Sequence, residues 1–151
     1  MRRFLTAVAL CLISTSAVVA GPASDAVKFF YAPDANETDP GNRARFTEPA
    51  LSKLAEYDRS AEGGELGCID WVMAIDAQDV DEAELARTLK LDEQVSGDDA
   101  TVTARFKLFP NSEDGERSVV WTLKQVDGDW KIADIAQADG TWRLSALECA
   151  L

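Results

Sequence analysis

Histidine is absent from this 151-residue chain, and its absence excludes several kinds of active site. Histidine is the commonest ligand of transition metals and the side chain best suited to proton transfer near neutral pH. A Ser-His-Asp or Cys-His catalytic site is therefore impossible. The sequence also lacks a glycine-rich phosphate loop and a dinucleotide-binding fingerprint. We expect neither a cofactor nor a metal ion.

Long apolar runs are scarce as well, and the one candidate lies at the N-terminus. Residues 1–20 open with Arg2 and Arg3, continue as an apolar run and end on small residues at Ala20. A membrane span needs about 20 apolar residues, whereas this run is short and interrupted by serine and threonine. The pattern is that of a secretory signal cleaved after Ala20. We therefore predict a periplasmic or secreted protein with no membrane span once the signal is removed.

Cysteine occurs only three times, and the signal decides how many remain. Cys11 lies inside the signal and would leave with it. The two that remain, Cys68 and Cys149, most simply form one disulfide in an oxidising compartment. A disulfide-bonded Cys68 could not act as a nucleophile.

Positive charge is in short supply, since 15 Lys and Arg residues stand against 27 Asp and Glu residues. Loss of Arg2 and Arg3 with the signal makes the mature chain still more acidic. An excess of this size argues against binding to nucleic acid or to an anionic membrane. The acids are spread along the chain, which fits a solvated surface and also fits the capture of a basic partner.

The first half of the mature chain reads as helices separated by loops. A short helix begins at Ser24 or Asp25 and ends before Pro33. Residues 34–42 are rich in Asp and Asn and also contain Pro40 and Gly41, so they predict a loop. A second helix begins with Thr47 as its N-cap. Three residues form its narrow apolar stripe: Leu51, Leu54 and Ala55.

The second half reads as an antiparallel sheet. Residues 81–86 predict a helix or turn that leads into a strand ending near Val95. Residues 100–108 alternate between apolar and polar side chains, which is the period of a half-buried strand. A third strand follows over residues 118–124. The order of helices and then strands predicts one α+β domain over residues 21–151.

A hairpin and a short terminal helix complete the prediction. Asp127-Gly128 suits a tight turn, because glycine accepts the positive φ that such turns require. Beyond this turn, Trp130 and Ile132 are expected to face the core, with Trp130 buried against the first helix. The last segment carries leucines at helical spacing: Leu144, Leu147 and Leu151.

Four segments resemble a known family. They are Phe29-Phe30, Cys68–Asp70, Asp76–Asp79 and Asp127–Ile135. Together they look like an exported bacterial family of unknown function in the nuclear-transport-factor-2-like, or cystatin-like, superfamily. The resemblance spans residues 26–135. It implies a curved antiparallel sheet packed on N-terminal helices, forming a cone with a possible pocket, and it implies no activity.

Some enzymes of that superfamily place an Asp base in the cone, and five residues here are candidates for such a pocket. They are Tyr31, Asp70, Trp71, Trp121 and Asp134. A carboxylate in an apolar pocket has a raised pKa and can exchange protons near neutrality. The alternative is structural: Asp134 bonds nearby backbone and the tryptophans belong to the core.

An acidic cluster precedes the sheet and could suggest calcium. Its members are Asp76, Asp79, Asp81, Glu82 and Glu84. Their spacing lacks the glycine and the distal glutamate of an EF-hand. We interpret the cluster as a solvated turn.

Two functions follow from these patterns. The first is a non-catalytic exported binding module in the cell envelope, whose acidic surface captures a basic protein such as a cell-wall hydrolase or toxin. The second is a small-molecule isomerase or hydratase with Asp and Tyr groups in a cone pocket. A structural envelope protein is a third, more distant reading. We adopt the binding module as the working hypothesis.

Overall fold

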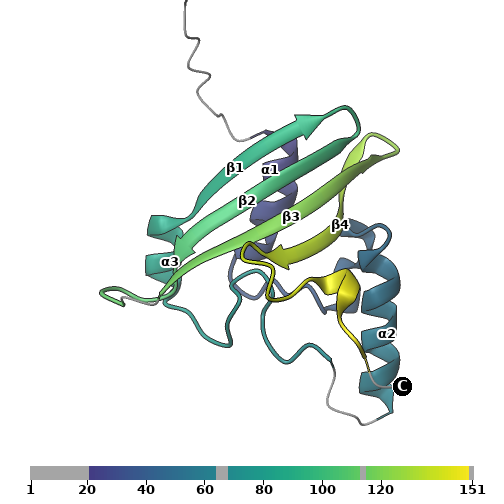
Figure 1. Cartoon of the computed structure of the whole chain (residues 1–151), viewed down its shortest axis with the longest axis horizontal. Helices are drawn as coiled ribbons and strands as arrows, with labels where there is room; N and C mark the ends of the chain where they lie inside the picture. Colours follow the sequence, from purple (N-terminus) through teal and green to yellow (C-terminus); the bar gives the residue numbers. More distant parts are fainter. Residues whose placement is uncertain (1–20, 64–67, 113–114, 150–151) are drawn as a thin grey trace, which may run out of the picture.

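Alternating apolar and polar residues in the second half of the chain form a curved antiparallel sheet (Figure 1). The computed structural model describes residues 21–63, 68–112 and 115–149. Within these residues the sheet has four strands in the order β1-β2-β3-β4. The strands are β1 Lys90–Ser96, β2 Asp99–Lys107, β3 Glu116–Val126 and β4 Asp129–Gln137. The α+β class and the antiparallel sheet are confirmed.

One face of the sheet is the core. The period of two predicted for β2 is confirmed, since every second residue from Ala100 to Phe106 is buried. Trp121 lies in the middle of β3, opposite Val102 of β2 and Ile135 of β4, and has no exposed surface. Asp127 and Gly128 make the β3–β4 turn with φ of 54° and 89°, as the sequence predicted.

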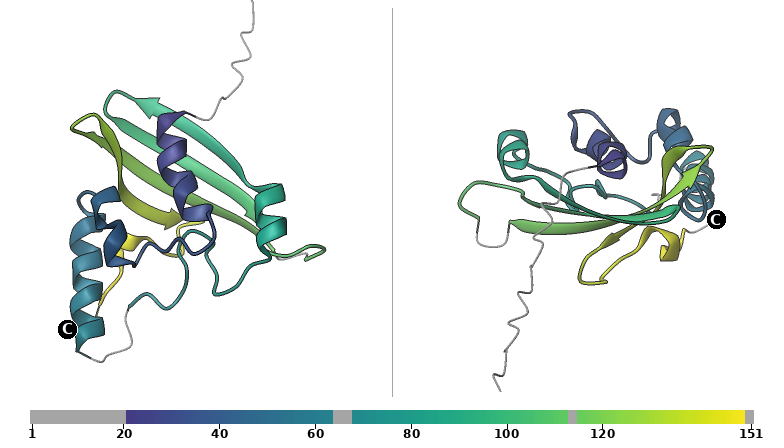
Figure 2. Two further views of the ribbon diagram at one scale, coloured as in Figure 1. Left: turned by 180° about the vertical axis from the view of Figure 1, so that it is seen from behind. Right: turned by 90° about the horizontal axis from the view of Figure 1, so that it is seen from above.

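Helices cover the core face of the sheet, as Figure 2 shows from above. The α-helices are α1 Pro22–Lys28, α2 Ala50–Glu62 and α3 Glu82–Thr88. The 3₁₀ helices are η1 Phe29–Tyr31, η2 Pro40–Arg45 and η3 Leu144–Ala146. In the part of the chain that is described, no helix is long and apolar enough to cross a membrane.

The helices begin later or earlier than the sequence predicted. Gly21 rather than Ser24 or Asp25 caps α1, because Pro22 suits the first helical position. α2 begins at Ala50 rather than after Thr47, since Pro49 occupies the N-cap. η2 overlaps the end of the predicted loop, residues 34–42, at residues 40–42. Of the expected stripe on α2, Leu54 is buried and Leu51 is half-buried, but Ala55 is exposed.

The C-terminal segment crosses the opposite face of the sheet at β4 (Figure 2). Arg143 forms an isolated bridge with Ala136, and Leu144 is buried. The helix predicted here is wrong beyond η3, because Leu147 is extended; Leu151 lies outside the described residues. Since β4 is covered on both faces, residues 132–136 are all buried and their alternation is lost.

Trp130 departs from its predicted burial. It is half-buried near the start of β4, where it lines a cavity beside Pro22 and Ala26 of α1. The predicted full burial of Trp130 is therefore wrong, although the residue does lie on the side of the sheet where α1 packs.

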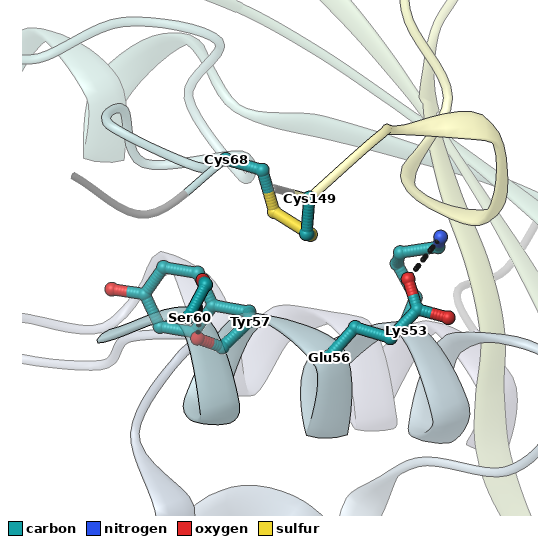
Figure 3. Close-up of a disulfide and its surroundings, with 6 residues drawn as sticks. All are labelled: Lys53, Glu56, Tyr57, Ser60, Cys68 and Cys149. Carbon is teal, nitrogen blue, oxygen red and sulfur yellow. Dashed lines mark hydrogen bonds and ion pairs between the residues drawn. A yellow bond between two sulfur atoms is a disulfide. The ribbon is translucent and has the colours of Figure 1, made fainter. Parts of the chain in front are cut away.

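The predicted disulfide is confirmed, and it joins Cys68 to Cys149 with Cα atoms 4.8 Å apart. Figure 3 shows the bond over α2, near Glu56 and Tyr57. The bond fastens the end of the chain to the segment that begins at residue 68. The predicted signal, residues 1–20, lies outside the described residues.

Candidate functional site

A cavity of about 570 Å³ opens where α3 meets two loops. Its walls are η1 with residues 32–35, the segment 72–80, and α3 itself. We call it the α3 cavity. Its volume lies within the range of about 300–1,000 Å³ that is usual for ligand pockets.

The α3 cavity has an apolar floor and an acidic rim. Phe30, Ile75 and Leu85 are buried core residues that also line it. The charged residues that line it are Asp34, Asp79 and Glu82, all of them exposed. Among the described residues that line it there is no Lys or Arg. The cavity therefore presents apolar surface below and negative charge above.

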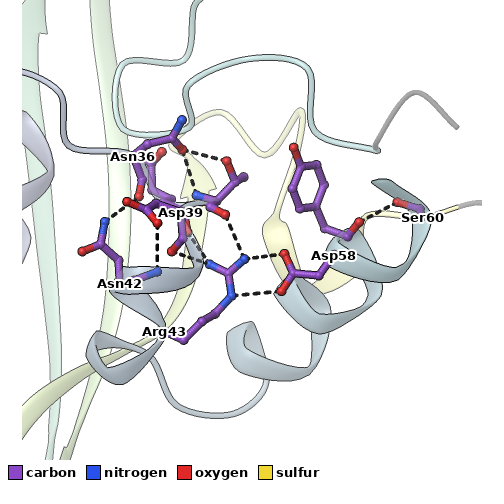
Figure 4. A network of polar contacts seen from close by, with 10 residues as sticks. Asn36, Asp39, Asn42, Arg43, Asp58 and Ser60 are labelled. Carbon is purple, nitrogen blue, oxygen red and sulfur yellow. Dashed lines mark hydrogen bonds and ion pairs between the residues drawn. The ribbon is translucent and has the colours of Figure 1, made fainter. Parts of the chain in front are cut away.

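Arg43 holds the loop that forms the first wall (Figure 4). Its guanidinium donates to the backbone oxygens of Glu37, Thr38 and Asp39 at 2.9–3.0 Å. It also donates to both carboxylate oxygens of Asp58 on α2, at 2.7 and 3.3 Å. The segment predicted as a loop is thus fastened to a helix.

Glu37 joins the first wall to the second. Its side chain is 1% exposed, and its Oε1 accepts a hydrogen bond from the backbone N–H of Ala74 at 2.5 Å. Burial raises the pKa of Glu37 to about 7, although backbone hydrogen bonds at Glu37, Ala74 and Met73 oppose that rise. A carboxyl that is partly protonated near neutral pH therefore connects the two loops.

Glu37 should make the stability of the protein depend on pH. Its pKa is raised from 4.5 to about 7 in the folded state, so folding is favoured while the group is protonated. The stabilisation is complete below pH 4.5 and is lost as the pH rises through about 7. We expect this loss to be about 3 kcal/mol and to disappear in Glu37→Gln. Urea unfolding across this pH range measures it.

Glu62→Gln is the matched control for that experiment, because Glu62 is exposed at the end of α2. The free energy of unfolding of this variant should fall with pH as steeply as that of the parent. A Glu37→Gln protein that loses as much stability between pH 4.5 and 7 as the parent would contradict the assignment.

Tyr31 and Trp121, two of the five predicted pocket residues, contact each other. The indole Nε1 of Trp121 donates to Tyr31 Oη at 3.1 Å. Tyr31 lines the α3 cavity, but Trp121 is wholly buried in the core. Burial raises the pKa of Tyr31 well above its ordinary value. A phenol in this environment gives up its proton less readily than one in water.

Asp70 and Trp71 line a different, smaller cavity of about 370 Å³. The ring of Trp71 packs against Trp142 with centroids 5.6 Å apart. Asp70 is exposed, and its backbone oxygen accepts from Gln78 at 3.3 Å. These two residues therefore lie apart from the lining of the α3 cavity.

Asp134 lies on the far face of the sheet, under the C-terminal segment. Its carboxylate accepts from the backbone N–H groups of Ile135 and Ser145 at 3.0 and 3.1 Å. It also accepts from Ser145 Oγ at 2.7 Å and from Arg143 at 2.8 Å. Asp134 therefore has the structural role that was the alternative to a pocket role: it bonds nearby backbone and anchors the end of the chain. The structure thus does not bring the five candidates together in one pocket.

The acidic cluster is only partly a solvated turn. Asp79 and Glu82 are exposed, but Asp81 caps α3 by accepting from the N–H of Glu84 at 2.8 Å. Glu84 is buried and pairs with Arg87 at 2.6 Å. Among the described residues, no group of three or more Asp, Glu or Cys side chains is placed to hold a metal ion.

Comparison with known proteins gives a fold and no family. No family model matches the sequence, and no curated protein sequence matches it. A chain of the type VI native effector–immunity complex Tae3–Tai3 from Ralstonia pickettii is similar, with a TM-score of 0.53 and 22% identity over 82% of this chain and 98% of that chain. The selenomethionine form of that complex gives a TM-score of 0.51 over 81% and 98%. At this identity the likeness establishes the fold.

Proposed function

We propose that this chain is an exported, non-catalytic module that binds a basic effector protein and neutralises it, as the immunity component of an effector–immunity pair. The observation that carries the proposal is the likeness to a chain of such a complex, which extends over 98% of that chain. The same backbone architecture is therefore found in a chain that takes part in such a complex.

The chemistry of the chain favours the immunity component over the effector. The sequence contains no histidine, and Cys68 and Cys149 are joined to each other. The oxygens of Asp134 already accept four hydrogen bonds within the protein. The isomerase alternative needs Asp and Tyr groups that converge on one pocket, and Tyr31 lies on the opposite side of the sheet from Asp134.

The charge of the chain supports a basic partner. Acids outnumber cations by 27 to 15, and many of the acids are exposed. Opposite charge on two proteins accelerates their encounter and disfavours wrong partners. Binding to an effector at low abundance benefits from such acceleration.

Export and superfamily membership belong to the same proposal. Cleavage after Ala20 would deliver the chain to the periplasm, where a disulfide such as Cys68–Cys149 persists. Membership of the nuclear-transport-factor-2-like superfamily is supported by the curved sheet with helices on one face.

Purification from the native host tests the proposal. We expect the tagged protein, isolated from the periplasm, to retain one basic protein in a defined stoichiometry. The two purified proteins should bind with a Kd that rises at least about tenfold between about 50 and 500 mM NaCl, because salt screens the charges. Isothermal titration calorimetry measures this change.

The outcomes separate the two parts of the proposal. A complex whose Kd is the same at both salt concentrations would contradict electrostatic capture and indicate an apolar interface. A purified partner that does not bind the protein at low salt would contradict the binding function itself.

A further inference from the structure

We propose that the α3 cavity is the docking site for a lysine or arginine side chain of the basic partner. This inference rests on the proposed function and identifies where on the surface the partner is recognised. It draws on the shape of the cavity, its charge, and the rigidity of its walls.

The cavity has the two surfaces that a long basic side chain requires. Lys and Arg bury their aliphatic stems on apolar surface while the charged group stays near water. Phe30, Ile75 and Leu85 provide such a surface at the floor. The acidic rim, to which Asp34, Asp79 and Glu82 belong, then meets the charged group.

The rim charges have no cation partner in the part of the chain that the structure describes. No ion pair joins Asp34, Asp79 or Glu82 to a cation among the described residues. By contrast, the nearby Glu84 is already paired with Arg87. The rim is therefore available to a cation that comes from another molecule.

The walls are held in place before a partner arrives. The loop that carries Asp34 is fixed to α2, because Arg43 donates a hydrogen bond to Asp58 of that helix. Glu37 connects the same loop to Ala74 on the second wall. A site that is already ordered loses less conformational freedom on binding. This arrangement suits a pocket that accepts one anchor side chain from a partner.

An NMR titration with a small probe tests the site without the partner. The probe is Nα-acetyl-arginine amide, and Nα-acetyl-citrulline amide is its neutral isostere. We expect the arginine probe to shift the amide resonances of residues 30–35 and 72–86, with weak affinity, and the citrulline probe to leave them unchanged.

A matched pair of triple variants decides whether the rim is responsible. Asp34→Asn, Asp79→Asn and Glu82→Gln together should weaken binding of the arginine probe by about tenfold. The control neutralises three exposed acids elsewhere, and should bind as the parent does: Asp99→Asn, Asp129→Asn and Glu62→Gln. The amide spectrum of each variant reports whether it is folded.

Three results would overturn the docking site. They are equal chemical-shift changes with both probes, chemical-shift changes scattered over the sheet, and an affinity for the arginine probe that is unchanged in the rim variant. Each concerns the cavity alone, so each would leave the proposed function standing if the purified partner still binds. A partner that fails to bind while the arginine probe behaves as expected would count against the proposed function and not against the cavity.

Discussion

Replacing Trp121 with alanine is expected to lower the free energy of unfolding by about 3–5 kcal/mol. The indole is wholly buried at the centre of the sheet. It stacks on Phe30 with ring centroids 5.4 Å apart and meets Tyr31 edge-on at 6.1 Å. Alanine would leave a cavity between the sheet and α1 with η1, and the surrounding rings could close it only in part. Urea unfolding followed by circular dichroism measures the change.

Trp121→Phe separates packing from hydrogen bonding in the same position. Phenylalanine keeps most of the aromatic packing but cannot donate to Tyr31 Oη. Losing this part-buried hydrogen bond should cost about 0.5–1.5 kcal/mol. An alanine variant as stable as the parent would place Trp121 outside the core and revive its interpretation as a pocket wall.

Removing the disulfide is expected to have an effect of similar size. Cys68 and Cys149 are separated by 81 positions, so the bond greatly restricts the unfolded chain. In the chain-entropy model a loop of this length contributes about 4 kcal/mol. Replacing both cysteines with serine should therefore lower the melting temperature strongly while the far-ultraviolet spectrum of the sheet is retained.

Reduction provides the control for the double serine variant. A reducing agent should destabilise the parent by about as much as the two substitutions do, and should leave the variant unchanged. Mass spectrometry of a non-reduced digest identifies the linked peptides. Two free thiols in periplasmic protein, or a parent that melts at the same temperature with and without reductant, would contradict the prediction.

The sheet was largely predictable from the sequence because local rules govern it. β2 has one buried and one open face, so its residues alternate, and Asp127-Gly128 fits the turn without regard to the rest of the chain. β4 was harder to predict. The C-terminal segment covers the second face of β4, and the sequence of residues 129–137 contains no pattern that predicts this contact.

The site was less predictable because distant residues assemble it. Glu37 meets Ala74 across 37 positions, and Arg43 meets Asp58 across 15. A single glutamate in a polar loop carries no local sign of burial. The acids of the rim were visible in the sequence, but their arrangement around an apolar floor depends on how α3 packs beside η1.

The position of β1 at the edge of the sheet bears on how copies of this protein behave at high concentration. Open edges offer unpaired backbone groups on which a strand of another molecule can add, the first step of fibrous aggregation. Glu93 of β1 points toward the helices, where its carboxylate accepts from the N–H of Ser24 at 2.6 Å. Charged side chains directed inward on edge strands discourage such addition. The contact that fixes the start of α1 thus also helps to keep one sheet from growing onto the next.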